Sequence, residues 1–305
     1  MNKITETLLR IVSEYDGDFK GAFNIREDGG CAGRQSTENV KIESKQDKPG
    51  LEIHVKPGTK GEQIAIPACV TRGKIDDLVY NDFYIGEGAD VTIVAGCGVH
   101  TDSDEEARHN GIHRFFLAKG AHVVYSEKHV GTGSGTGARR IDPVTEVYLE
   151  EDASLEMDTV QIRGVDSTVR KTGGKLGAGA KLIVRERIMT DGYEKAQTDF
   201  DVTLEGEGAG ADLISRSVAK GHSHQIFNSC IRGENRCTGH SECDAILADE
   251  GTVEAAPSLV ASHVDAELIH EAAIGKIAGE QILKLRTLGL TEEEAEEKII
   301  SGFLK

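Results

Sequence analysis

Three residues near the end of the chain have side chains that bind iron or sulfide well. Cys243 lies in the segment Ser-Glu-Cys-Asp, and His270 and Glu271 follow within about thirty residues. A thiolate is a soft metal ligand, whereas an imidazole and a carboxylate are harder ones. This combination predicts a site for iron or sulfide.

A second candidate metal site overlaps the first. Cys237, His240 and Cys243 are spaced three residues apart, and Cys230 lies upstream. On a strand, residues 237 and 243 face one side and residue 240 faces the other, so one ion binds all three only if the strand bends. A structural zinc site therefore stays open, as does a role for Cys230 and Cys237 as extra ligands, sulfur acceptors or core residues.

Other motifs fail on their surroundings. Residues 131–138, Gly-Thr-Gly-Ser-Gly-Thr-Gly-Ala, resemble a dinucleotide fingerprint, but that site needs a helix directly behind the glycines. Pro143 and a strand-like segment follow instead, which predicts a flexible loop. The zinc-protease motif that begins at His270-Glu271 would need a histidine where Ile274 stands.

The remaining histidines have simple interpretations. His100, His109 and His113 lie among acidic residues, and we interpret this segment as a solvated loop. His222 and His224 share one strand face, where a functional role and a solvated pair are equally open.

An internal repeat begins near residue 80. Five copies share an alanine followed by alternating apolar positions, and the anchoring alanines are residues 89, 121, 153, 180 and 211, spaced by 32, 32, 27 and 31. A fixed period filled with period-two strands is typical of a solenoid. We expect a mainly β protein with a parallel β-helix over residues 80–265, in which each repeat holds two coils of two short strands. An antiparallel sandwich stays the alternative.

Both ends of the chain depart from this pattern. Residues 1–79 contain a predicted amphipathic helix from Met1 to about Ser13, followed by irregular strands. Residues 266–305 form a predicted helical hairpin, because a helical stripe stops at Gly289 and a capping box at Thr291 and Glu294 opens a second helix. The stripe comprises Ile274, Ile277, Ile282, Leu285 and Leu288, and the inner face of the second helix comprises Ala295, Ile299 and Phe303. So small an apolar pair needs a partner surface.

Composition excludes several classes of protein. A net charge of −17 disfavours nucleic-acid binding, and no apolar stretch approaches the roughly 18 residues of a membrane span. The chain has no signal-peptide core, and its six cysteines are irregularly spaced, which predicts a cytoplasmic protein with reduced thiols. The absence of Trp argues against a carbohydrate-active β-helix.

At the level of motifs the chain resembles the SufB/SufD iron–sulfur cluster assembly scaffolds, particularly short forms found beside a single ABC-type ATPase. The resemblance is dense from about residue 215 to 305 and looser back to about 80. The motifs that carry it are Gly221-His222-Ser223, Glu242-Cys243-Asp244, His270-Glu271-Ala272, Gly275-Lys276-Ile277, Glu280-Gln281, and the terminal Leu-Gly-Leu-Thr-Glu-Glu-Glu-Ala through Ile-Ile-Ser-Gly-Phe.

The resemblance implies a right-handed parallel β-helix between helical ends. Two chains would pair through the ends of their β-helices, and each C-terminal helical region would dock a SufC-like ABC ATPase. Cys243 matches the essential SufB thiol, His270 a histidine shared at the interface, and Glu271 a SufB-type carboxylate. Ile269 stands where SufB often has an acid, and the additional cysteines of the longer SufB N-terminal region are missing from this sequence.

The expected function is therefore a scaffold, not an enzyme, that builds a transient iron–sulfur cluster. A sulfur donor and apo-protein recipients would be its further partners, and ATP hydrolysis would belong to the docked ATPase. Mixed ligands suit this role, because a cluster that four thiolates do not lock in place can form and then leave. The alternative is a non-catalytic β-helical adaptor for an ATPase, with a structural zinc or no metal.

Overall fold

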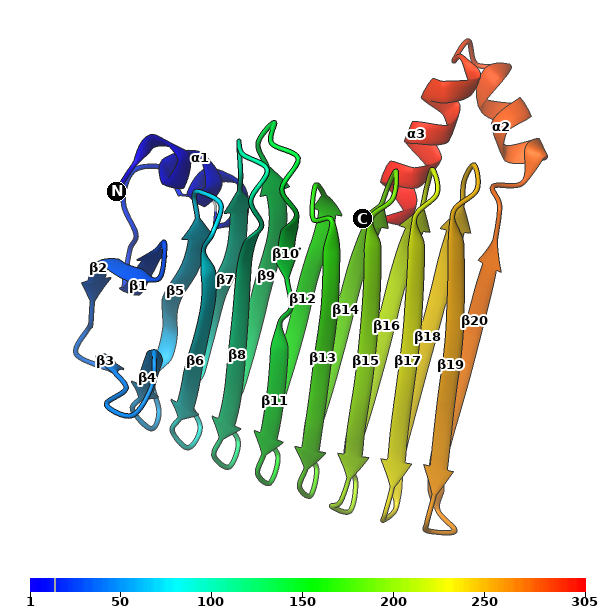
Figure 1. Cartoon of the computed structure of the whole chain (residues 1–305). Coiled ribbons are helices and arrows are strands. Elements are labelled where there is room, and N and C mark those ends of the chain that lie inside the picture. The colour runs from blue at the N-terminus through cyan, green and yellow to red at the C-terminus, as the bar shows by residue number, and fades with distance from the viewer. Residues whose placement is uncertain (14) are drawn as a thin grey trace.

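The computed structural model describes residues 1–13 and 15–305 and has the form of a long parallel β-solenoid with helices at both ends (Figure 1). Two sheets face each other, and each turn of the chain contributes one strand to each sheet. The expected parallel β-helix is thus confirmed, and the sandwich alternative is wrong, because nearly every strand pairs in parallel with the strand one turn away.

Within residues 1–13 and 15–305, the first sheet contains ten strands. In chain order they are β1 (Ala22–Glu27), β2 (Gly30–Gln35), β5 (Lys60–Val70), β7 (Asp90–His100), β9 (His122–Thr132), β12 (Ser154–Arg163), β14 (Lys181–Thr190), β16 (Gly210–Ala219), β18 (Cys237–Leu247) and β20 (Ala266–Gly275).

The second sheet contains the other ten strands of the described part of the chain. They are β3 (Val40–Ser44), β4 (Gly50–Val55), β6 (Asp76–Ile85), β8 (Ala107–Leu117), β10 (Arg139–Ile141), β11 (Val144–Leu149), β13 (Ser167–Leu176), β15 (Lys195–Leu204), β17 (His224–Gly233) and β19 (Thr252–Ala261).

Each repeat forms one coil of two long strands, not the expected two coils of short ones. Four of the anchoring alanines, residues 89, 121, 153 and 180, sit at one corner of this coil and are fully buried. The fifth corner residue is Ala209 and not Ala211, because Lys181 pairs with Gly210. Cys237 and Ala266 continue the same corner column.

The solenoid extends past both expected boundaries. β4 already pairs in parallel with β6, and β20, which covers residues 266–275, pairs in parallel with β18. Ile274 therefore belongs to a strand, and the first C-terminal helix, α2, runs only over Gly279–Arg286. A spacing of three or four residues between apolar side chains also occurs by chance across a strand–helix junction, which is why the expected helical stripe began too early.

The second C-terminal helix, α3 (Glu292–Phe303), begins at the predicted capping box: the Thr291 side chain accepts from the Glu294 amide, and the Glu294 carboxylate accepts from the Thr291 amide. Its buried residues are Ala295 and Ile300, and Ile300 packs on Val218 at the end of β16. Of the expected inner face, Ala295 is buried and Phe303 packs against the same cluster, whereas Ile300 takes the buried position expected for Ile299. α2 buries no residue at all and leans away from the solenoid (Figure 1).

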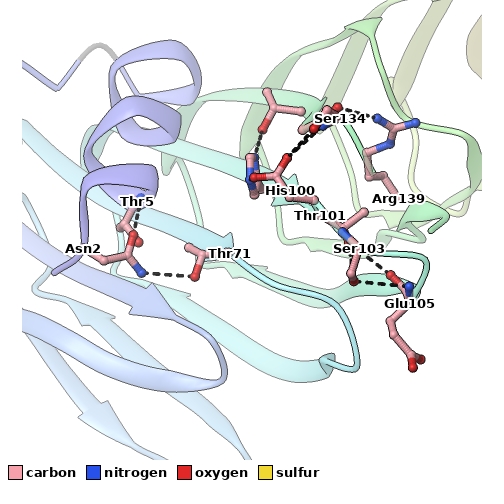
Figure 2. Close-up of polar contacts among 12 residues, drawn as sticks. Asn2, Thr5, Thr71, His100, Thr101, Ser103, Glu105, Ser134 and Arg139 are labelled. Carbon is pink, nitrogen blue, oxygen red and sulfur yellow. Dashed lines mark hydrogen bonds and ion pairs between the residues drawn. The ribbon is translucent and has the colours of Figure 1, made fainter. Parts of the chain in front are cut away.

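The N-terminal helix, α1 (Lys3–Val12), covers the N-terminal part of the first sheet. Leu8, Leu9 and Val12 are buried against it, and Gly96 and Gly98 on β7 leave room for this close approach. Asn2 caps the helix by accepting from the Thr5 amide and also donates to Thr71 (Figure 2). Within the described residues, no helix has the length and apolar character needed to cross a bilayer.

The C-terminal end of the solenoid is not covered in this way. β19 and β20 each pair on one side only within the described chain. Their exposed large apolar residues are Leu259, Val260, Ile269 and Ile274. The end therefore presents two open strand edges.

Candidate functional site

Cys243 lies inside the solenoid, one strand from its open end. Side chains on β18 alternate between the two faces of the sheet, and Cys243 points inward with only 1% of its surface exposed. Its neighbours in register are Ser215 on β16 and Ala272 on β20. β20 therefore covers the thiol from the open end.

His270 and Glu271 follow one another on β20 and so point to opposite faces. His270 pairs with Ser241 and faces the interior, where its Nδ1 is buried without a hydrogen-bond partner. Glu271 pairs with Glu242 and faces outward, with 68% of its side chain exposed. The fold brings Cys243 and His270 to one face and places Glu271 on the other.

The thiol of Cys243 is strongly held in its protonated form. Burial, together with the nearby carboxylates of Glu186 and Asp244, raises its pKa to about 12. Only the thiolate form of a cysteine acts as a nucleophile or as a metal ligand. Cys243 is therefore unreactive until the site opens or a cation replaces the proton.

A row of polar side chains leads through the interior toward Cys243. Glu127, Thr159, Glu186 and Ser215 occupy the same inward column on successive strands, and Cys243 comes next. The Glu186 carboxylate accepts hydrogen bonds from Ser215 and from Thr198 across the interior, both at 2.9 Å.

Arg170 joins the two buried glutamates of this row. Its guanidinium lies 2.7 Å from Glu127 and 3.2 Å from Glu186, with 4% of the side chain exposed. Nearby charges of Arg170 and His129 hold the pKa of Glu127 well below its usual range against the effect of burial, whereas burial raises that of Glu186. The guanidinium of Arg170, together with His129, thus outweighs the effect of burial on the pKa of Glu127, whereas the same guanidinium does not outweigh it for Glu186.

The same interior contains two histidines that we expected in a solvated loop, and that expectation is wrong. His113 contacts the Tyr125 hydroxyl at 2.9 Å, and burial lowers its pKa to about 4. His109 pairs with Asp77 at 3.0 Å. The alternation of His109, Gly111, His113 and Phe115 along β8 was the signal, and the neighbouring acidic residues obscured it.

His100, at the end of β7, keeps a partly exposed position. It contacts Asp102 and Thr132, and Asp102 accepts from the Ser134 amide (Figure 2). Ser134 belongs to the glycine-rich segment 131–138, whose residues 133–138 form a loop after the end of β9, with no helix behind it. A Cβ at Gly131 would overlap the Gly164 carbonyl, so packing against the next coil explains that glycine.

Comparison with known proteins gives these residues a context. The family described as "SUF system FeS cluster assembly, SufBD core domain" matches residues 81–303, well over half of the chain. The chain belongs to the SufBD family. Its members are named for iron–sulfur cluster assembly.

Three SufBD relatives show how far the similarity extends. The chain is 30% identical over 268 residues to an iron–sulfur cluster assembly SufBD family protein of Methanothermobacter thermautotrophicus, covering 86% of this chain and 64% of the relative. It is 28% identical over 274 residues to one of Archaeoglobus fulgidus, covering 89% and 72%, respectively. For one of Methanocaldococcus jannaschii the values are 25% over 284 residues, 88% and 86%. The chain thus spans less than two thirds of the Methanothermobacter protein.

In this SufBD chain the other cysteines near Cys243 are separated from it. Cys237 occupies the buried corner column, whereas Cys230 on β17 alternates outward. His240 faces outward from β18, as strand alternation predicted. The described residues do not bring Cys237, His240 and Cys243 to one point.

Two groups of three metal-binding side chains do converge among the described residues. Cys97, Glu127 and His129 form a buried group, and His240, Glu242 and Glu271 form an outward one. The buried group already contains the Arg170 guanidinium, which contacts both Glu127 and His129 and occupies the position of a cation. Among the described residues, the outward group differs from the buried one, because no such cation contacts its histidine, His240.

Proposed function

We propose that this chain is a scaffold on which an iron–sulfur cluster is built and then transferred, with Cys243 as its thiolate ligand. The observation that carries the proposal is the position of Cys243: an inward thiol at the end of a polar row, covered only by the terminal strand β20. His270 faces the same interior space and has an unpaired ring nitrogen, which makes it the second ligand.

Cluster formation at Cys243 requires the loss of one proton. The Fe–S bond forms as the S–H bond breaks, and the proton moves toward the Ser215–Glu186 pair in the same inward column or to solvent. Because burial disfavours the free thiolate, metal binding and deprotonation occur together. A site with these properties binds iron only when it is open, which suits a scaffold that must later release its cluster.

The open edges of β19 and β20 support pairing with a second copy of this chain. Unpaired strand edges with exposed apolar residues are templates for strand addition. Glu271, on the opposite face of β20, reaches the cluster only around this edge. A site completed at a dimer interface would therefore combine Cys243, His270 and Glu271, while Cys237 in its corner would take no part.

The α2–α3 hairpin supports docking of a SufC-like ABC ATPase. Leu283 and Leu288 are 61% and 75% exposed, and a groove of about 490 Å³ separates the hairpin from the solenoid. ATP hydrolysis by the docked partner would move the hairpin and thereby the nearby strand ends of β18 and β20. A sulfur donor and apo-protein recipients would complete the cycle.

Anaerobic reconstitution with iron and sulfide tests this function. We expect absorption and Mössbauer signals of a cluster in the wild type and in Cys237→Ser, a matched change of another buried cysteine on β18, but none in Cys243→Ser. Circular dichroism checks that each variant is folded. A folded wild type that binds an ATPase but no cluster would instead indicate the adaptor function.

A further inference from the structure

The outer face of the last two rungs carries a set of metal ligands that the cluster site does not use fully. We propose that His240, Glu242 and Glu271 bind one divalent transition-metal ion there, on the opposite side of the sheet from Cys243. Its use as an iron-loading site rests on the proposed function, whereas metal binding itself does not.

The donor atoms are nearly at coordination distance. One ligand atom from each residue lies within 4.8 Å of the others, and the His240 Nε2 is 3.7 Å from a Glu271 carboxylate oxygen. Donors about 2.1 Å from one ion are about 3.0 to 3.6 Å apart at angles of 90–120°. Small rotations of the half-buried Glu242 and the exposed Glu271 side chains close the remaining difference.

A fourth residue, Asp212, orients the imidazole of His240. Asp212, one rung away on β16, accepts a hydrogen bond from the His240 Nδ1 at 2.8 Å. Because a carboxylate only accepts, the ring proton lies on Nδ1, and the lone pair of Nε2 points to the glutamates. This carboxylate–histidine arrangement is common among protein metal sites, where it orients the ring and increases its basicity.

The local charge also favours a cation. Asp244 follows on the same face of β18, and the Arg216 guanidinium lies 3.8 Å from Glu242. Asp212, Glu242, Asp244 and Glu271 thus place four carboxyl groups around His240 and Arg216. A bound dication would relieve that repulsion.

The ligand types indicate the class of metal. One imidazole with two carboxylates and open positions to solvent suits Fe²⁺, Mn²⁺ or Zn²⁺, whereas Cu⁺ prefers thiolates and Ca²⁺ or Mg²⁺ prefer oxygen ligands alone. Glu242 adjoins Cys243 in the chain, and Glu271 adjoins His270. An ion bound here would therefore lie one sheet thickness from the thiol of Cys243.

A sulfide-free anaerobic titration of the full chain with Mn²⁺ tests the proposal by electron paramagnetic resonance. We expect one tightly bound ion with nitrogen hyperfine coupling from an imidazole. His240→Gln should remove that coupling and weaken binding at least tenfold, Glu242→Gln should weaken binding similarly, and Asp212→Asn should weaken it about 10- to 100-fold.

Two control variants should leave Mn²⁺ binding unchanged. His224→Gln changes another outward histidine, which lies on the second sheet and contacts Thr252 there. Cys243→Ser removes the inward thiol. The proposal is overturned if the wild type lacks nitrogen coupling or if His240→Gln binds Mn²⁺ as well as the wild type does. Cluster formation without a Mn²⁺ site overturns this inference alone, and Mn²⁺ binding without cluster formation overturns the proposed function alone.

Discussion

The protonated state of Cys243 leads to a quantitative expectation for its chemical reactivity. Alkylation by iodoacetamide requires the thiolate. At pH 8, a thiol with the usual pKa of about 8.5 is about one quarter ionised. With the pKa of Cys243 at about 12, the ionised fraction is on the order of one in ten thousand. Ionisation alone should therefore slow alkylation by about 2,000-fold.

Timed alkylation with peptide mass spectrometry measures this rate at each cysteine of the native chain. Cys31 is exposed and serves as the fast reference. We expect Cys243 to react at least about 1,000-fold more slowly than Cys31, with a rate that keeps rising tenfold per pH unit up to pH 10. Labelling of Cys243 within tenfold of Cys31 would refute the buried, protonated thiol.

Cys69 provides the matched comparison. It is also buried, and burial raises its pKa to about 12, but it lies near the covered N-terminal end. Equal rates at Cys69 and Cys243 would indicate that ionisation limits both. A faster reaction at Cys243 would show that its end of the solenoid opens more often.

Three further predictions concern stability. Arg170→Met should lower the free energy of unfolding by about 3–5 kcal/mol in urea titrations, because it leaves Glu127 and Glu186 buried without their cation; an unchanged midpoint contradicts this. Between pH 6.5 and 4, His113 is protonated in the unfolded chain but not in the folded chain. Through this residue the free energy of unfolding should therefore fall by about 1.4 kcal/mol per pH unit as the pH falls. His113→Gln should flatten that slope in urea titrations. Thr291→Ala should destabilise α3 by about 1 kcal/mol, measured by hydrogen exchange of its first-turn amides, with no effect on α1.

The sequence revealed the solenoid because its corners impose a local rule. Each coil needs a small residue at the same turn, so alanine recurs with the period of the coil. The register at the fifth copy was not predictable in this way, since Ala209 and Ala211 obey the same alternation and only the hydrogen bonds of β14 with β16 distinguish them. The predicted number of coils per repeat was wrong for a related reason. A period of about thirty residues fits either one coil of long strands or two coils of short strands.

The site was predictable to the extent that it follows strand alternation. Alternation alone separates Cys243 from His240 and His270 from Glu271. The interior polar row was not predictable, because Arg170 meets Glu127 across 43 residues of sequence, and no local pattern encodes contacts across the interior. For the same reason His109 and His113 read as loop residues until the strands were paired.

The uneven ends of the solenoid determine where the fold loosens first. In a solenoid, stability is approximately a sum over neighbouring turns, so an inner rung is held from both sides and a terminal rung from one. Near the N-terminus α1 packs on β5, β7 and β9, whereas β20, the last strand of the same sheet, has no helix packed along it within the described chain. Local opening should therefore be most frequent at β20, the strand over Cys243. The exposure of the thiol is thus governed by the stability of one terminal strand rather than by that of the whole fold.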